Sequence, residues 1–338
     1  MRDTHAMAPI IQAEDLRKTY RIRQQQPGLR HAIRALVRPD WIERAALDGV
    51  SFAVEEGAIA GLMGANGAGK STLIKLLVGI MPRDGGSLTV AGLDPFRHRK
   101  HYVQRIGVVF GQRSNLLWDL SVAESFELHG AVFGVARADY ERRLADLTDL
   151  FELGELLNQP ARTLSLGQTM RCAVAQVLLQ QPDILFLDEP TIGLDVVSVE
   201  RLGQALKRLN AAFNTTILIT SHDLAVIEDI CSQVILLESG RILFDGTARA
   251  AVERYGRYRR LRFVFPPGAD IAAAASFLRG KGVVVIEDGP ELCGVVDAEA
   301  GMVGTCAALV DELTCRHGLA EFFVEKPSLK EVILHAYR

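Results

Sequence analysis

Several features are scarce or missing in this 338-residue sequence, and each absence removes a class of protein. The five cysteines form no CxxC pair, which is typical of reduced, buried thiols and not of a disulfide framework. The net charge of −3 implies no general affinity for nucleic acid, so we expect no nucleic-acid partner. No apolar run reaches the roughly 18 residues of a membrane-spanning helix, and acids interrupt the N-terminus where a signal peptide would be apolar. A membrane role is therefore expected only at the surface or through a partner.

Apolar residues make up 49% of the chain, which is enough for a sizeable core in two domains. The first 250 residues alternate short apolar strands with helix-period segments, and this pattern predicts an α/β domain. The expected strands are Gly57–Met63, Ile106–Phe110, Ile184–Leu187, Thr216–Thr220 and Gln233–Glu238. The expected helices are Lys70–Val78, Ser121–Phe133, Ala138–Phe151, Thr169–Gln180, Val197–Asn210 and Leu224–Cys231.

An arginine-rich stretch between Arg254 and Arg262 marks a change of composition. We assign residues 1–250 to the first domain and 256–338 to a C-terminal accessory domain. The second domain reads as strand, helix, strand, strand, helix, strand, the order of the ferredoxin-like α+β fold, and a last helix is expected at Ser328–Tyr337. It has no acid pair, phosphate loop or ligand cluster, so we expect it to regulate or stabilise a dimer without being catalytic.

A glycine-rich loop follows the first expected strand and precedes the first expected helix. It reads GANGAGKST from Gly64 to Thr72 and fits the pattern G-x-x-x-x-G-K-[ST]. The glycines let successive backbone N–H groups face a polyphosphate, and the helix N-terminus adds partial positive charge. Lys70 would reach the β- and γ-phosphates, and Ser71 would offer its hydroxyl to Mg²⁺. The loop therefore predicts a site for a nucleotide with Mg²⁺.

Two acids, Asp188 and Glu189, directly follow the apolar run ILFL of the third expected strand. Charged groups at the end of a buried strand are costly unless they have partners or a function. Asp188 would hold Mg²⁺ directly or through water, and Glu189 would polarise the attacking water. Taken alone, the pattern describes a strand that runs into an acidic turn. Beside a phosphate loop, we interpret it as a hydrolytic site.

Two further polar residues follow expected strands. Gln112 comes after IGVVF and would ligate Mg²⁺ or position water; in isolation it is equally well a surface amide. His222 comes after TILIT, where a parallel strand meets its ligand crevice, and would contact the γ-phosphate. A lone histidine is more often a helix cap or a core residue.

These motifs together resemble the ATP-binding cassette (ABC) ATPases, whose six motifs occur in order within residues 10–250. The resemblance identifies the signature as Leu164–Gln168 and the D-loop as Gly193–Asp195, and it places Tyr20 against adenine. The ATP-binding residues that it implies are Tyr20, Gly64, Asn66, Gly67, Ala68, Gly69, Lys70, Ser71, Thr72, Ser165, Gly167, Gln168 and Asp195. It implies Glu189, His222 and Gln112 as catalytic residues and Ser71, Gln112 and Asp188 as Mg²⁺ ligands.

The resemblance implies an α/β fold, a P-loop NTPase of ABC type, with a helical signature subdomain at about residues 114–180 and an insertion at 21–47. In this family the signature binds the γ-phosphate held by the other subunit, so two cassettes enclose two ATP molecules. Ser165 and the N–H groups at the start of a helix suit that role, because together they form an anion site. Leu166 replaces the first glycine of the common LSGGQ, and leucine tolerates a positive φ poorly.

The wider sequence, including VVFGQRSNLLWDL, resembles the ATPases of ABC-2 type exporters. The resemblance implies ATP hydrolysis coupled to an ABC-2 type transmembrane permease, in a homodimer or heterodimer of cassettes. The expected location is peripheral, on the cytoplasmic side of the inner membrane. ABC proteins that act on ribosomes carry two cassettes, whereas this chain has one phosphate loop. DNA-repair ATPases insert a long coiled coil where this chain has the compact segment Leu116–Thr163.

The insertion contains an amphipathic pattern between Gly28 and Trp41. An apolar stripe lies beside a basic one, and Pro39 ends the pattern. Such a helix suits an anionic membrane surface or an acidic groove of the permease. The alternative is a helix packed on its own cassette with its arginines in solvent. The apolar positions are Leu29, Ile33, Leu36 and Val37, and the basic ones are Arg30, Arg34 and Arg38.

Overall fold

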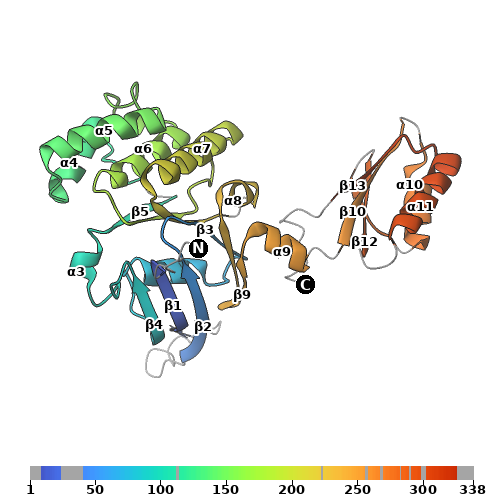
Figure 1. Cartoon of the computed structure of the whole chain (residues 1–338), viewed down its shortest axis with the longest axis horizontal. Coiled ribbons are helices and arrows are strands. Elements are labelled where there is room, and N and C mark those ends of the chain that lie inside the picture. The colour runs from blue at the N-terminus through green and yellow to red at the C-terminus, as the bar shows by residue number, and fades with distance from the viewer. Residues whose placement is uncertain are drawn as a thin grey trace, which may run out of the picture. The chain divides into compact units, whose positions relative to one another are not determined.

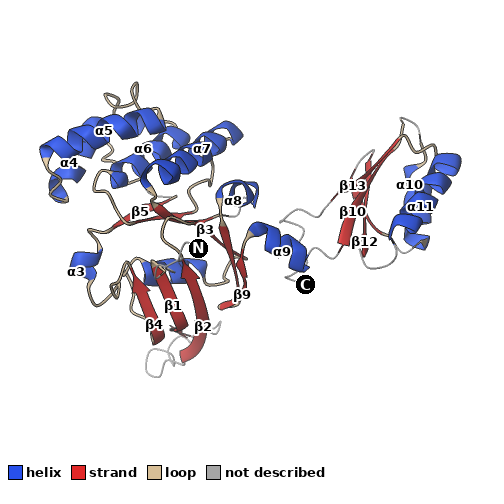
Figure 2. Ribbon diagram, in the orientation of Figure 1, coloured by secondary structure: helices blue, strands red, loops and turns tan. Residues whose placement is uncertain are grey.

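The chain forms two compact units, Met1–Thr247 and Ala248–Arg338, and the predicted boundary at 250–256 falls close to their division. The computed structural model describes residues 9–23, 41–111, 114–221, 224–255, 258–266, 269–281, 283–288, 291–297 and 302–325. The helices expected at 28–40 and 328–337 lie outside these residues, as do Gln112 and His222. Each unit is described by itself below (Figures 1 and 2).

A six-stranded sheet forms the centre of the first unit, and all of its strands are parallel except the last, β9. Its strands are entirely buried in the middle, as expected where helices and a second sheet cover both faces. Phe110 pairs with Asp188, and Asp188 pairs with Thr220, so three carboxyl ends share one edge of the sheet. The strand order is β5 (Ile106–Phe110), β6 (Ile184–Asp188), β7 (Thr216–Thr220), β3 (Ile59–Gly64), β8 (Gln233–Glu238) and β9 (Arg241–Gly246).

A three-stranded antiparallel sheet packs beneath it, with strand order β2 (Trp41–Val54), β1 (Ile11–Arg23) and β4 (Gly85–Val90). Helix α2 (Lys70–Leu77) shares its apolar core with both sheets, and this burial fixes the helix that starts at the phosphate loop. Both ends of the insertion predicted at 21–47 are strand, because Arg21 pairs with Glu43 across β1 and β2.

Helices cover the other side of the six-stranded sheet. Figure 1 shows α4 to α7 gathered on the side away from β1, β2 and β4. Four elements occupy the signature subdomain predicted at about 114–180, and the last of them starts at Leu166, three residues before the expected Thr169. The helices that follow α2 in the first unit are α3 (Arg99–Tyr102), α4 (Val122–Val132), α5 (Arg137–Phe151), η1 (Ala161–Thr163), α6 (Leu166–Leu178), α7 (Val196–Phe213) and α8 (Leu224–Ile230).

The second unit begins with a helix that the sequence analysis does not predict, α9, and from β10 to β13 it has the predicted order of strands and helices. Its antiparallel sheet has the order β11-β12-β10-β13, and α10 and α11 cover one face of it (Figure 2). Phe263, Leu278 and Leu313 are fully buried in the core between sheet and helices. The elements are α9 (Ala248–Tyr255), β10 (Tyr258–Val264), α10 (Ile271–Gly280), β11 (Val284–Asp288), β12 (Glu291–Asp297), α11 (Met302–His317) and β13 (Glu321–Glu325).

Candidate nucleotide site

The phosphate loop joins β3 to α2 and leaves the first turn of the helix open. Gly69 is the N-cap of α2 with φ 111°, and no side chain caps its N–H groups. Gly67 also has a positive φ of 83°, and a side chain there would meet nothing within 4 Å, so the loop faces open space. A side chain at Gly64 or Gly69 would collide with the backbone of Leu237 or Ala46. Glycine is therefore required at Gly64 and Gly69 because the backbone packs closely there, and at Gly67 because the loop turns with a positive φ.

Lys70 folds back across this loop. Its Nζ donates hydrogen bonds to the carbonyl oxygens of Gly64 at 2.6 Å and Ala65 at 3.2 Å, and the residue is only 7% exposed. Burial lowers the pKa of Lys70, and the nearby carboxylates of Glu189 and Asp188 oppose that shift. The ammonium group is thus held beside both acids, where a polyphosphate can take the place of the carbonyl oxygens as its partner.

The two acids lie at the carboxyl end of β6, as the sequence predicts, next to the end of β7. Thr220 Oγ1 donates to Asp188 Oδ1 at 2.7 Å and accepts a hydrogen bond from the Glu189 N–H at 2.8 Å. Glu189 has a φ of 54°, which is uncommon for a residue other than glycine. Backbone strain of this kind gathers at functional sites, where surrounding contacts hold it in place.

Gly111 brings β5 to the same edge. Its N–H donates to the Asp188 carbonyl at 2.7 Å, and a side chain on Gly111 would collide with the Glu189 carbonyl oxygen. Gly111 and Ser221, which lie at the edge that carries the acids, directly precede Gln112 and His222 in the sequence. The sequence motifs do not include Gly111 and Thr220; the only sequence signal of these two residues is their place at strand ends close to Gln112 and His222.

The residues near the phosphate loop fit Mg²⁺ by their chemistry. Ser71 is exposed in the first turn of α2 and offers a hydroxyl oxygen, and Asp188 offers a carboxylate. Mg²⁺ prefers oxygen ligands and is usually held by one or two carboxylates together with substrate phosphates and water. Among the described residues no group of three His, Cys, Asp or Glu could form an all-protein metal cage. A donor set of this size suits an ion that arrives with a nucleotide.

Tyr20 lies beside the phosphate-loop helix. Its hydroxyl is 3.3 Å from Thr72 Oγ1 and donates to Met81 Sδ at 3.2 Å, while the side chain stays half-buried on β1. These contacts bring the predicted adenine-facing ring to the helix that carries the phosphate loop. Asn66 is exposed at the tip of the loop, and Ala68 is buried beneath it.

The signature motif forms the start of α6. Ser165 is the N-cap, and it closes a capping box in which its Oγ accepts from Gln168 N and Gln168 Oε1 accepts from Ser165 N. Leu166 is the first helical residue and is absent from the residues with positive φ in the described chain. The replacement of glycine by leucine therefore costs no backbone strain here. Leu166 is 47% exposed at the surface.

The D-loop packs directly against this helix start. Gly167 is buried, and a side chain there would collide with Ser198 Oγ in the first turn of α7. Asp195 caps α7 by accepting from Ser198 N at 2.9 Å and from Ser198 Oγ at 2.8 Å, and these bonds lower the pKa of its carboxyl. Signature and D-loop thus form one continuous surface.

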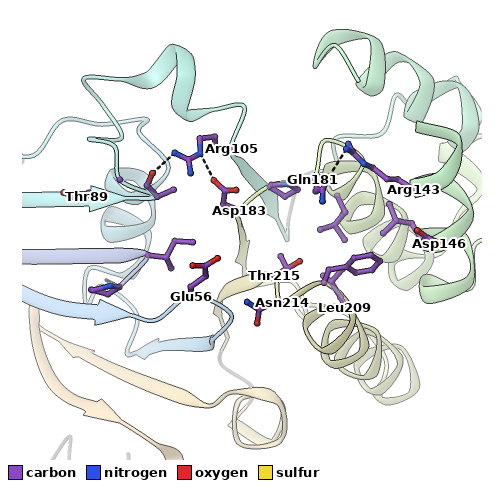
Figure 3. Close-up of a pocket in the computed structure, with 18 of the residues that line it drawn as sticks. Glu56, Thr89, Arg105, Arg143, Asp146, Gln181, Asp183, Leu209, Asn214 and Thr215 are labelled. Atoms are coloured by element: carbon purple, nitrogen blue, oxygen red, sulfur yellow. Dashed lines mark hydrogen bonds and ion pairs between the residues drawn. The ribbon is translucent and has the colours of Figure 1, made fainter. Parts of the chain in front are cut away.

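A separate cavity of about 630 Å³ lies at the amino ends of β5, β6 and β7 (Figure 3). Arg105 and Asp183 lie in its wall and are joined by a 2.6 Å ion pair. Each strand is five residues long, so about 16 Å of sheet separates this cavity from the phosphate-loop edge. The cavity is therefore not the nucleotide site.

Known proteins are similar to this chain in sequence. A family model described as ABC transporter matches residues 47–192. The daunorubicin resistance ATP-binding protein DrrA3 of Streptomyces coeruleorubidus is 30% identical over 294 residues, which cover 87% of this chain and 91% of that protein. The chain belongs to the ABC transporter ATP-binding protein family. The ABC transporter ATP-binding protein NatA of Bacillus subtilis is 30% identical over 220 residues, or 65% of this chain and 89% of that protein.

Solved ABC cassettes have the same fold. The structure of cbiO1 from Clostridium perfringens, part of the ABC transporter complex cbiONQ, matches with a TM-score of 0.61 and 26% identity over 73% of this chain and 92% of that one. The chain is thus an ATP-binding subunit of an ABC transporter, from a family whose members generally hydrolyse ATP, dimerise and work with transmembrane permeases. Among its described residues, no helix combines the length and apolar character needed to cross a membrane.

Proposed function

We propose that this ABC subunit hydrolyses ATP to drive an ABC-2 type exporter. One observation carries the hydrolytic part: Lys70, Asp188 and Glu189 lie together beside an open helix N-terminus, at the carboxyl edge of a parallel sheet. This is the crevice in which α/β proteins bind ligands. Lys70 supplies positive charge, and Glu189 supplies a carboxylate that can accept a proton.

In the proposed mechanism, the N–H groups from Gly67 to Ser71 and the Lys70 ammonium hold the β- and γ-phosphates. Ser71, Asp188 and Gln112 would hold Mg²⁺, which when bound neutralises the charge of the phosphate oxygens. Glu189 orients the attacking water and accepts its proton, and His222 contacts the γ-phosphate. Tyr20 stacks on adenine.

The second half of each site comes from another cassette in this proposal. Ser165 keeps its hydroxyl proton free to donate, because in the capping box its oxygen acts as the acceptor. Apolar side chains are exposed around this helix start, and a side chain on Gly193 would touch Leu166. Exposed apolar groups of this kind mark a protein interface. They are Leu166, Ile192, Val196 and Val197, with exposures of 47%, 41%, 84% and 58%.

The permease partner is supported by the relatives and by a second exposed surface. The relatives include a Nod factor export ATP-binding protein and a daunorubicin resistance ATP-binding protein, which favour export. Leu117 and Trp118 are exposed a few residues after Gln112, and Leu128 and Val132 are exposed on α4. We propose that this surface docks on the permease, which places the subunit on the cytoplasmic side of the inner membrane. The second unit would regulate or stabilise the dimer.

Purification of the full chain from membranes tests this function. The expected result is co-purification of a membrane protein with several apolar spans, together with MgATP hydrolysis by the complex. Recovery with ribosomes or DNA and without a membrane protein would contradict the transport role. Failure of the complex to release phosphate from MgATP would contradict the hydrolytic one.

A further inference from the structure

We propose that Thr220 is a positioning residue for hydrolysis, because its single hydroxyl holds the metal-binding carboxylate and the catalytic residue together. The inference rests on the proposed function and concerns a residue outside the family motifs identified above. Thr220 is fully buried at the end of β7, directly opposite Asp188 in the register of the sheet.

The Thr220 hydroxyl group both donates and accepts a hydrogen bond. Its proton goes to Asp188 Oδ1 at 2.7 Å, and its oxygen accepts the Glu189 N–H at 2.8 Å. A carboxylate with one oxygen held in a charge-assisted bond can no longer rotate freely, so the direction of its other oxygen is fixed as well. Partners of this kind orient the groups that ligate a metal.

The same bond fixes an unusual backbone. Glu189 combines a φ of 54° with a position before Pro190, where a residue normally adopts an extended conformation. Its N–H is held from β7 by the Thr220 hydroxyl and more weakly by the Thr220 carbonyl at 3.2 Å. Thr191 Oγ1 and Ser221 Oγ, 3.2 Å apart, tie the next residues of the two loops together. The Thr220 hydroxyl thus fixes the backbone position from which the Glu189 side chain extends.

The other end of β7 offers a matched control. Thr216 is also fully buried, and its Oγ1 accepts the Gly57 N–H at 2.9 Å. It lies at the amino end of the strand, away from the phosphate loop. Thr216→Val and Thr220→Val therefore each remove one buried threonine hydroxyl from the same strand, but only Thr220→Val alters the acids.

The experiment compares Thr220→Val, Thr220→Ser and Thr216→Val in the full chain with its partner. We expect Thr220→Val to lower kcat by about 10- to 100-fold with KM for ATP within about threefold of wild type. Thr220→Ser should recover most of the rate, and Thr216→Val should lose stability without losing kcat. A second readout is the melting temperature with ATP and EDTA against MgATP. In Thr220→Val, the additional stabilisation by Mg²⁺ should shrink while that by ATP with EDTA remains.

The outcomes separate this inference from the proposed function. If wild type hydrolyses ATP and Thr220→Val is equally fast, the positioning role is wrong while the function stands. Equal losses of kcat in Thr216→Val would show a general packing effect, and failure of Thr220→Ser to recover would show that the γ-methyl group matters instead of the hydroxyl. Both would overturn the inference. No hydrolysis by wild type would overturn the proposed function itself.

Discussion

The N-terminus of α2 is proposed to hold a γ-phosphate and that of α6 to contact the γ-phosphate held by the partner cassette, yet the two helix starts are built in opposite ways. The first turn of α2 has Gly69 at its N-cap and no side-chain cap, so its N–H groups are open. The first turn of α6 is closed by the Ser165–Gln168 capping box. Lys70 adds a buried charge to the first site, whereas the first turn of α6 has no charged residue.

Because of this difference, we expect the start of α2 to bind ATP within one subunit and the start of α6 to contact ATP only in the dimer. An uncapped helix start with a buried ammonium is incomplete without an anion, so it should bind ATP in a single subunit. A capped helix start is stable alone and gains less from a phosphate. It should engage only when the partner's loop presents one, and this dependence couples dimer closure to ATP.

Helix α4 carries a second capping box and offers a comparison for α6. Ser121 and Glu124 close the same box there, at a helix outside the assigned motifs. Glu124 adds a negative charge at the position where α6 has neutral Gln168. The neutral box leaves α6 able to approach an anion, and the α4 box serves as a natural control.

The largest effect is expected on the α2 side. Lys70→Ala should lose ATP binding and lower hydrolysis by about a thousandfold, because a point charge on the phosphates disappears from a partly dry site. Binding of a fluorescent ATP analogue and phosphate release measure the two losses. Near wild-type hydrolysis in a folded variant would remove Lys70 from the site.

Glu189→Gln should lower ATP hydrolysis while ATP binding is retained. The amide cannot accept a proton, so hydrolysis should fall by about a hundred- to a thousandfold while ATP binding remains. Dimers should then accumulate with MgATP, because the α6 contact persists until the γ-phosphate is cleaved. Size-exclusion chromatography with light scattering measures the dimer. A monomer that still binds ATP but does not turn it over would argue against closure by α6.

Ser165→Ala tests the role of the α6 capping box in hydrolysis, and Ser121→Ala, which removes the α4 capping box, is its control. Each variant loses one capping box and should lose about 1 kcal/mol of stability, or about 2–4 °C in melting temperature. Only Ser165→Ala should also lower hydrolysis, by about tenfold, since it removes a hydroxyl from the partner's phosphate. Equal hydrolysis in the two variants would reduce Ser165 to a helix cap.

The smallest effect concerns pH. Burial lowers the pKa of Lys70, and its charged form exists below that pKa. ATP affinity should therefore weaken as pH rises through the lowered pKa, and titration of ATP binding from neutral to alkaline pH checks this. Lys70→Arg stays charged and, if it binds, should show a flatter profile. An equally flat wild-type profile would contradict the buried ammonium.

Much of the first unit follows from short-range patterns in the sequence. The phosphate loop and the central strands combine apolar runs with glycine or acids at their ends, and the structure brings Lys70, Asp188 and Glu189 together as expected. The order of elements in the second unit was predictable for the same reason. The expected helix begins at Thr169, whereas α6 begins three residues earlier at Leu166, behind the capping box of Ser165 and Gln168.

Other features depend on contacts that sequence spacing does not reveal. The sheet of β1, β2 and β4 pairs segments far apart in the chain and has irregular register, so its alternation is weak. The role of Thr220 arises only when β7 is aligned with β6. Leu166 raised a concern about positive φ that the helical backbone at this position removes. The expected helix at 28–40 and the residues Gln112 and His222 stay predictions.

A complementation assay tests the composite site most directly. Lys70→Ala spoils the loop of its own subunit, and Ser165→Arg spoils the signature offered to the partner, so each homodimer should be inactive. An equimolar mixture should regain about a quarter of wild-type activity, since random pairing makes about half of the dimers mixed and each mixed dimer has one complete site. Activity of the mixture that merely equals the mean of the two separate variants would contradict a site shared between two cassettes.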